Sequence, residues 1–218
     1  IPILGKMFRY LASQTKTNIC CHVDHGYTLD ECYEGIDSGF TSVMFDGSKL
    51  TLKENIKISK KIASRAHKYN ISIEGEIGFV GYDNGKISEG TNIEDAVSFA
   101  NKSNIDAMAI SVGNTHLQIS KKASIDFKKI NLIESKTKIP LVLHGSSGIP
   151  VEQRKRLARK TKVAKLNIGT EIRMTFGEAL RKNLKNNPKT YDRLQLLKPT
   201  IKDLTKVTKK IIKQIGPN

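Results

Sequence analysis

The stretch Cys21-His22-Val23-Asp24-His25-Gly26 places two histidines and a carboxylate at the end of an apolar run. Polar and ionisable side chains are uncommon in the interior of a buried strand. A glycine follows directly, which is typical of a strand that runs into a turn. The same arrangement recurs along the chain, and it decides between the folds that the sequence allows.

Short β-branched runs alternate with longer segments of helical period. The expected strands are residues 19–25, 42–47, 72–78, 107–113, 140–145 and 163–169. The expected helices are residues 53–69, 92–102 (with Asn92 as N-cap), 124–135, a segment whose first helical residue is Pro150, and 170–186. This alternation predicts a parallel sheet with crossover helices. No linker or low-complexity tract interrupts it, so we expect residues 1–218 to form a single α/β domain.

The carboxyl ends of the expected strands indicate the architecture. All six runs finish in polar residues beside a glycine or a turn. In an open doubly wound sheet, only the strands beside the switch point need to carry ligand chemistry. A closed (β/α)8 TIM barrel brings every strand end round one mouth, where barrel active sites lie. The sequence therefore favours the barrel.

Three of the five histidines stand at the ends of three different expected strands: His25, His116 and His144. One core histidine is more often a hydrogen-bonded structural residue than a ligand. Three that converge on one mouth are hard to explain in that way, and three imidazoles with an open fourth position form a catalytic zinc site. Asp24 would lie at the same mouth, where it could act as an acid or a base.

Other polar residues have plainer explanations. Asp46 and Glu76 end neighbouring strands, where either could be a strand-end or helix-cap residue. His67 lies in a helical segment and is expected at the surface. His22 shares a strand face with Asp24, so we expect it to support the site or to be structural.

Composition limits the class of protein. The chain has 218 residues, 38% of them hydrophobic, and no apolar run long enough to span a membrane. No signal peptide opens it, so a cytoplasmic protein is expected. Cys20, Cys21 and Cys32 show no paired metal-binding spacing, and buried free thiols are the better interpretation.

The net charge of +16, from 37 Lys and Arg against 21 Asp and Glu, would suit nucleic acid, a membrane or phosphorylated metabolites. The lysines are spread along the chain without interleaved aromatic residues, so a solvated lysine-rich surface is the preferred explanation. Residues 198–213 are the densest basic stretch. They are expected to form an amphipathic helix with a buried stripe of Ile201, Leu204, Val207, Ile211 and Ile215.

The segments CHVDHG, GFTSVMFDGS, IEGEIG, ISVGNTH, PLVLHGSSGIP and KLNIGTEIR resemble, in order and spacing, the class II fructose-bisphosphate aldolase family, over nearly the whole chain. That family includes tagatose-bisphosphate and related ketose-bisphosphate aldolases. The resemblance implies a (β/α)8 barrel that cleaves a phosphorylated ketose into dihydroxyacetone phosphate and an aldehyde. A divalent metal, usually zinc, stabilises the enediolate.

The resemblance also implies roles for individual residues. The three strand-end histidines match the metal ligands, and Asp24 matches the acid or base at the cleaved carbon. Asp46 and Glu76 match carboxylates at an alternative metal position. The residues that match the binding site for dihydroxyacetone phosphate are Gly145, Ser147, Asn167, Gly169 and Thr170.

The sequence departs from the family pattern in several places. Residues 1–13 match the second helix of the barrel, so its first two strands are expected to lie ahead of Ile1. Leu117 stands where better-known members have a glycine that helps to bind phosphate and a monovalent cation. Ser146 replaces a common glycine, and Asp83 is the one carboxylate left in the loop 79–85 for the second proton transfer. These differences favour a divergent substrate.

Fructose 1,6-bisphosphate is the default substrate. The first alternative is a sibling aldolase for tagatose bisphosphate or for a deoxy or sulfo ketose phosphate. The second is a noncatalytic basic protein that binds nucleic acid or another partner, against which the intact set of three histidines and Asp24 argues. For the enzyme, a phosphorylated sugar is the expected partner, with no nucleic acid or membrane partner, and the family suggests a homodimer or homotetramer.

Overall fold

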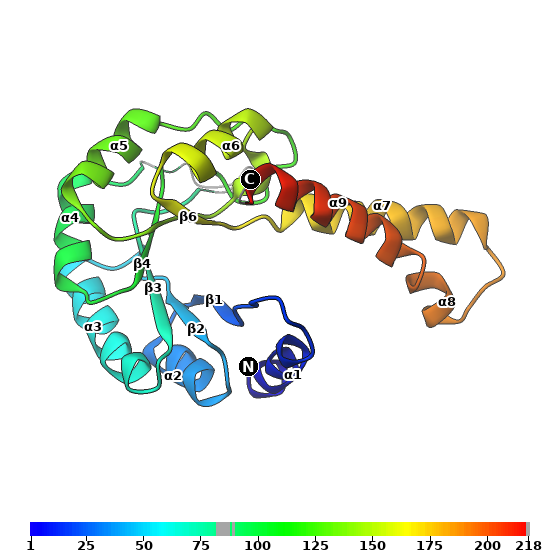
Figure 1. Cartoon of the computed structure of the whole chain (residues 1–218), viewed down its shortest axis with the longest axis horizontal. Helices are drawn as coiled ribbons and strands as arrows, with labels where there is room; N and C mark the ends of the chain where they lie inside the picture. Colours follow the sequence, from blue (N-terminus) through cyan, green and yellow to red (C-terminus); the bar gives the residue numbers. More distant parts are fainter. Residues whose placement is uncertain (82–87, 89, 217–218) are drawn as a thin grey trace.

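The computed structural model describes residues 1–81, 88 and 90–216. Its centre is a parallel sheet whose six strands follow one another in chain order (Figure 1). The strands are β1 (His22–Gly26), β2 (Ser42–Phe45), β3 (Ser72–Ile77), β4 (Ala107–Ile110), β5 (Leu141–Leu143) and β6 (Val163–Leu166). The helices are α1 (Pro2–Ser13), α2 (Leu29–Asp37), α3 (Leu52–Lys68), α4 (Ile93–Lys102), α5 (Phe127–Lys136), α6 (Val151–Lys160), α7 (Thr170–Asn186), α8 (Arg193–Leu197) and α9 (Thr200–Ile215), with a 3₁₀ turn, η1 (Ser146–Gly148).

The sheet is strongly curled. Its strands line the inside of an open C, and helices α2 to α6 cover the outside (Figure 1). Strands β1 and β6 form the two edges, and no ladder of hydrogen bonds joins them within the described residues. Each neighbouring pair is parallel. This arrangement confirms the predicted α/β barrel architecture over six strands.

The main core lies between the strands and the outer helices. It contains fully buried residues such as Ile62 and Phe99. A smaller cluster of Met44, Ala109 and Val142, on β2, β4 and β5, lies apart from this core. Because side chains alternate between the two faces of a strand, each strand supplies residues both to the core and to the inside of the curl.

Local signals fix where several helices begin. Thr28 and Thr51 each form a capping box with the glutamate three residues on. The predicted cap Asn92 accepts a hydrogen bond of 3.0 Å from the backbone N–H of Asp95, which confirms that prediction. Such caps set the length of the turn between a strand end and its helix. The polar residues predicted at the carboxyl ends of the strands lie at or beside these turns.

Several boundaries differ from those expected. The helix predicted over residues 124–135 begins at Phe127, capped by Asp126, and Pro150 precedes the first residue of α6. Cys21 and Cys32 are buried as predicted, but the prediction for Cys20 was wrong, because it lies exposed ahead of β1. Asp83 lies outside the described residues.

Helices α7, α8 and α9 form an arm that projects from the curled sheet (Figure 1). The predicted basic helix is present as α9, but its apolar stripe is not buried along its whole length. Ile211 is 6% exposed, whereas Ile201 is 61% exposed. The N-terminal part of α9 belongs to the projecting arm, where there is less protein to cover it.

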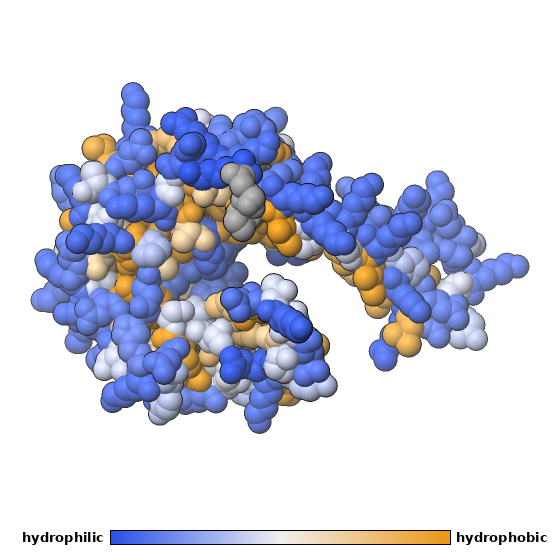
Figure 2. Space-filling model, in the orientation of Figure 1, coloured by the Kyte–Doolittle hydropathy of each residue, from blue (hydrophilic) through white to orange (hydrophobic). Residues whose placement is uncertain are grey.

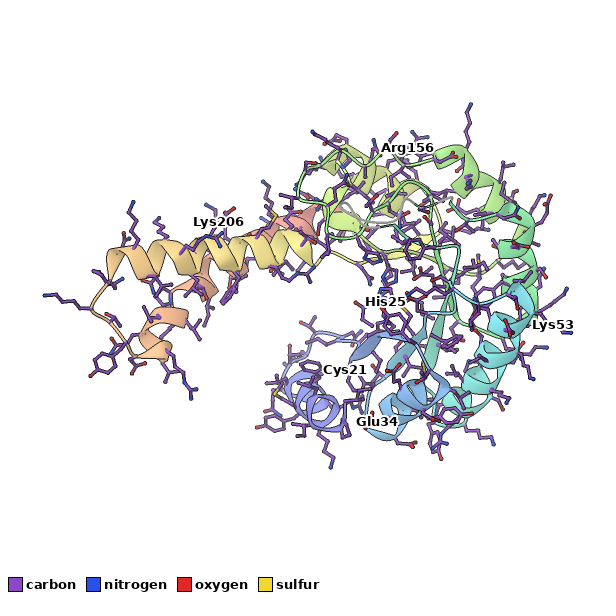
Figure 3. The ribbon with its side chains drawn as sticks, turned by 180° about the vertical axis from the view of Figure 1, so that it is seen from behind. Cys21, His25, Glu34, Lys53, Arg156 and Lys206 are labelled. Atoms are coloured by element: carbon purple, nitrogen blue, oxygen red, sulfur yellow. The ribbon has the colours of Figure 1, made fainter. Side chains whose placement is uncertain are left out.

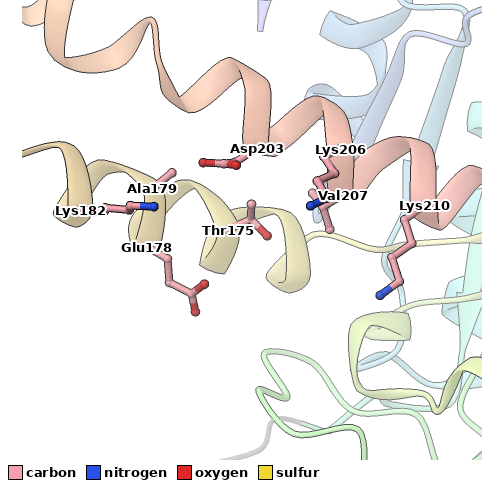
Figure 4. A pocket seen from close by; sticks show the side chains of 8 residues that line it. All are labelled: Thr175, Glu178, Ala179, Lys182, Asp203, Lys206, Val207 and Lys210. Carbon is pink, nitrogen blue, oxygen red and sulfur yellow. The ribbon is translucent and has the colours of Figure 1, made fainter.

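A groove of about 380 Å³ runs along the arm between α7 and α9 (Figure 4). Lysines from both helices and the carboxylates Glu178 and Asp203 line it. The face seen in Figure 2 is mainly hydrophilic, with apolar residues inside the curl and along the lower edge of the arm. None of the described helices is both long enough and apolar enough to cross a membrane.

Candidate metal and substrate site

The structure brings most of the predicted site residues round one cavity of about 120 Å³ at the carboxyl ends of the strands. The predicted residues that line it are Asp24, His25, His116, His144, Gly145, Ser147, Asn167, Gly169 and Thr170. Leu117 and Arg173 complete the lining. Asp46 and Glu76 lie behind His25 and do not line this cavity.

The three histidines form the centre of the site. They come from β1 and from the segments after β4 and β5, and His25 lies inside the curl of the sheet (Figure 3). The ring of His25 is 4.7 Å from that of His144 and 5.3 Å from that of His116, centroid to centroid. One nitrogen from each ring lies within 4.8 Å of the others.

His25 is held by the carboxylate of Asp46, which directly follows the next strand, β2. Its backbone has φ of +59°, in the left-handed region. Its Nδ1 lies 2.9 Å from Oδ2 of Asp46, whose Oδ1 accepts hydrogen bonds from the N–H and hydroxyl of Ser48. Burial alone would raise the pKa of Asp46, but the bonds from His25 and Ser48 outweigh it and lower the pKa to about 2. An ionised Asp46 engages Nδ1 and leaves Nε2 of His25 for a metal.

His144 is also held by a carboxylate, one that the sequence analysis missed. Its Nε2 lies 2.8 Å from Oε1 of Glu74, a residue that is 2% exposed. Glu74 and Glu76 occupy alternate positions of β3, so their side chains lie on one face. That spacing in IEGEIG was the available signal, because two carboxylates on the inside of one strand need partners there.

Glu76 belongs to a second potential metal-binding group, with His25 and Asp46, whose ligand atoms also lie within 4.8 Å of one another. Its Oε2 is buried and has no hydrogen-bond partner among the described residues. Burial, followed by the charge of Asp46, raises the pKa of Glu76 well above its ordinary value. A buried carboxylate oxygen without a partner is suited to a cation.

These donor sets fit a divalent metal ion. The first group offers three imidazole nitrogens, and two of the rings are held from behind by carboxylates. Metal-binding histidines are usually oriented in this way. Asp24 lies beside this group, with Oδ1 3.8 Å from Nδ1 of His144. It also accepts a hydrogen bond of 3.1 Å from the side-chain amide of Asn167.

Two turns form the other side of the cavity. Gly145 has φ of +63°, and a Cβ there would lie 2.2 Å from the carbonyl oxygen of Thr115, so a side chain is excluded. The second turn leads into α7, which begins at Thr170. The hydroxyl of Ser147 joins the turns by accepting a hydrogen bond of 3.1 Å from the backbone N–H of Glu171. Backbone N–H groups at such a helix start attract phosphate.

Two arginines near these turns were also missed by the sequence analysis. Arg173 lines the cavity and donates a hydrogen bond of 3.3 Å to the hydroxyl of Thr170. Arg154 is fully buried. It donates to the carbonyl oxygens of Ser147 and Ile149 and to the carboxylate of Glu171, so it joins both turns. Its burial could not be predicted from the sequence, because Arg154 is one of five basic residues in the amphipathic helix α6.

The comparison with protein families gives one match over the full length. The family model for "Fructose-bisphosphate aldolase class-II" matches residues 1–218. The chain belongs to this family. Its members are metal-dependent aldehyde-lyases, so the recognition made from the sequence motifs is confirmed.

Named relatives within the family differ in substrate. The chain is similar to the 6-phospho-5-dehydro-2-deoxy-D-gluconate aldolase of Shouchella clausii, with 36% identity over 201 residues, 91% of this chain and 68% of the relative. It is 33% identical to the fructose-bisphosphate aldolase of Staphylococcus aureus over 202 residues, 91% of this chain and 70% of the relative.

Solved structures confirm the fold. The YdjI aldolase of Escherichia coli K12 matches with a TM-score of 0.83 and 25% identity, over 99% of this chain and 76% of that one. A fructose-1,6-bisphosphate aldolase homologue from Coccidioides immitis gives a TM-score of 0.82 at 20% identity, over 98% and 76%. The chain therefore spans about three quarters of the length of these structures.

Proposed function

We propose that this aldolase cleaves a ketose phosphate into dihydroxyacetone phosphate and an aldehyde, with zinc held by His25, His116 and His144. One observation carries the proposal. The three imidazoles, the carboxylate of Asp24 and the start of α7 all face the same cavity. Three imidazoles are a usual ligand set for catalytic zinc.

The protein residues supply binding and proton transfer. When bound, the metal withdraws electron density from the ketone and stabilises the negative charge that cleavage leaves on the neighbouring carbon. Asp24 takes the proton of the C4 hydroxyl as the C3–C4 bond breaks, so that C4 becomes the aldehyde carbon and the bonding electrons remain with C3. The N–H groups of the turns at Gly145 and Thr170 hold the phosphate next to the ketone. Protonation of C3 then completes dihydroxyacetone phosphate.

Two substrates are preferred among those to be tested. Fructose 1,6-bisphosphate is the default substrate for the family. A second candidate, 6-phospho-5-dehydro-2-deoxy-D-gluconate, is favoured by the relative with 36% identity, whose name specifies that substrate. Leu117, at the edge of the cavity and 54% exposed, is a residue that a substrate would meet.

The proposal includes the location of the enzyme in the cell and its oligomeric state. Phosphorylated sugars are retained inside cells by their charge, so we place the reaction in the cytoplasm. We expect a homodimer or a homotetramer, as is usual in the family.

The deciding experiment measures the release of dihydroxyacetone phosphate by the intact protein, through a coupled assay with an NADH-dependent reductase. The substrates are fructose 1,6-bisphosphate, tagatose 1,6-bisphosphate and 6-phospho-5-dehydro-2-deoxy-D-gluconate. We expect turnover of at least one, loss of activity with a chelator, and recovery with zinc. If zinc-loaded protein releases no dihydroxyacetone phosphate from any of the three, the proposed function is wrong.

A further inference from the structure

A chain of polar side chains lies beneath the three histidines, on the inside of the curled sheet. Glu74 of β3 is its centre. One carboxylate oxygen is 2.8 Å from Nε2 of His144, and the other is 2.7 Å from Nζ of Lys165 on β6. Nζ of Lys165 is also 3.2 Å from Nε2 of His22 on β1, whose Nδ1 is 2.8 Å from the hydroxyl of Ser42. These side chains link β1, β2, β3 and β6 with the segment that follows β5.

Two independent contacts indicate the same tautomer of His144. An ionised carboxylate has no proton to donate, so in its contact with His144 the carboxylate of Glu74 accepts and Nε2 carries the proton. The side-chain amide N–H of Asn167 lies 3.0 Å from Nδ1 on the other side of the ring and can only donate. Nδ1 therefore carries the electron pair, which accepts from Asn167 here and would bind a metal in place of that contact, and Nδ1 is on the side of Asp24.

Lys165 explains why Glu74 can remain charged at this depth. The side chain of Glu74 is 3% exposed, and an isolated carboxylate in such a position would be strongly disfavoured. Lys165 supplies the compensating charge at 2.7 Å. This ion pair, together with the contact to Nε2 of His144, gives each oxygen of the Glu74 carboxylate a partner.

We propose that Glu74, kept charged by Lys165, is a positioning residue for His144, which fixes its ring and its tautomer so that Nδ1 faces the metal. The proposal rests on the metal site of the proposed function. It goes beyond that function by assigning a role to two residues that touch neither the substrate nor the metal. The alternative is that Glu74 and the partly exposed Lys165 form an ion pair that stabilises the barrel and has no effect on the metal.

The first test measures the zinc dissociation constant of the intact protein by competition with a chromophoric chelator. Replacing both charges together, as Glu74→Leu with Lys165→Met, leaves no unpaired buried charge, so folding should be retained. We expect zinc to bind about 10–100-fold more weakly, the usual effect of removing a carboxylate behind a metal-binding histidine. Glu74→Gln should give a smaller loss, because an amide oxygen can still accept from Nε2.

The matched control is His67→Asn. His67 forms a pair of similar geometry, 3.0 Å from Asp106, but its side chain is 44% exposed, on α3. Breaking that pair should leave zinc affinity unchanged. If the double variant folds and binds zinc as tightly as the wild type, Glu74 is only a structural residue and the proposal is wrong.

A second measurement does not depend on whether the variants fold. The ¹⁵N chemical shifts of His144 in the metal-free wild type report which ring nitrogen carries the proton, and we expect Nε2–H. An Nδ1–H tautomer would overturn the proposal. Both readouts can also be separated from the aldolase assay: tight zinc binding that depends on Glu74, in a protein that cleaves none of the sugars, would refute the proposed function and leave this inference intact.

Discussion

Asp24 is the residue whose proposed role can be separated from metal binding. It lies beside His144 but belongs to neither potential metal-binding group. Asp24→Asn keeps an oxygen that can accept from Asn167 and removes only the basic carboxylate. We expect turnover to fall by ~10²–10⁴, the usual contribution of one general acid or base. Zinc content, measured by metal analysis on the same sample, should remain that of the wild type, and near-normal turnover would refute the assignment.

Leu117 is a residue in an unfavourable backbone conformation at the edge of the cavity. Its φ is +57°, in the left-handed region. A non-glycine residue there costs roughly 1–2 kcal/mol, whereas glycine loses about 0.5–1 kcal/mol more chain entropy on folding. Leu117→Gly should therefore raise the free energy of unfolding by about 0.5–1 kcal/mol.

The measurement for Leu117 is the urea midpoint at an unchanged m-value. Asn104→Gly is the matched control, because Asn104 has φ of +59° and asparagine tolerates this region. Its effect should stay within about 0.5 kcal/mol. A destabilised Leu117→Gly variant would show that contacts of the leucine side chain outweigh the strain.

Single residues of the site differed in how well they could be predicted. His25, His116, His144 and Asp24 were found because each strand end carries a visible chemical group next to a turn. Glu74 and Lys165 were missed because their partners come from strands that are far apart in the sequence. Nothing in the local pattern of either strand shows which charge lies opposite it across the inside of the sheet.

At the scale of elements, all six strands were predicted in their correct places, because alternating β-branched runs and amphipathic segments reflect burial directly. Five strand ends were predicted too late by one to three residues, and β1 ends one residue later than predicted. The residues just after three strands include glycines in the left-handed region, Gly78, Gly113 and Gly145, and the sequence does not show at which residue the backbone leaves the strand conformation. Helix α9 shows a different limit, because its stripe records apolar spacing but not how much protein covers it.

The stripe of α9 gives a prediction that separates its two ends. Ile211, 6% exposed, lies in the part of α9 nearest the barrel, whereas Ile201 is 61% exposed on the arm. Ile211→Ala should lower the free energy of unfolding by about 2–4 kcal/mol. Ile201→Ala, the same change in the same helix, should stay within about 0.5 kcal/mol. Denaturant unfolding of both variants tests this, and equal losses would mean that Ile201 is covered in the protein in solution.

On the scale of the whole molecule, the curl of the sheet gathers residues that are more than one hundred positions apart into one cavity. The 37 lysines and arginines behind the net charge of +16 are instead spread along the chain. Lys206 on the arm and His25 inside the curl lie in separate parts of the molecule (Figure 3). Binding of polyanions to the lysines of the arm should therefore respond to salt, whereas aldolase activity inside the curl should respond to a chelator.

This separation predicts how the intact protein behaves with polyanions. We expect only weak association with duplex DNA, with a dissociation constant of ~10⁻⁶ M or weaker at physiological salt, and a steep loss of affinity as salt increases. A chelator should abolish aldolase activity and leave that association unchanged, because the lysines of the arm do not bind the metal.

Lys206→Gln with Lys210→Gln should reduce the salt dependence of binding by up to about one phosphate contact each, and leave turnover unaffected. The matched variant His144→Ala should do the reverse, losing metal and turnover while binding DNA like the wild type. Tight DNA binding at physiological salt by a protein without lyase activity would favour the noncatalytic basic protein over the aldolase.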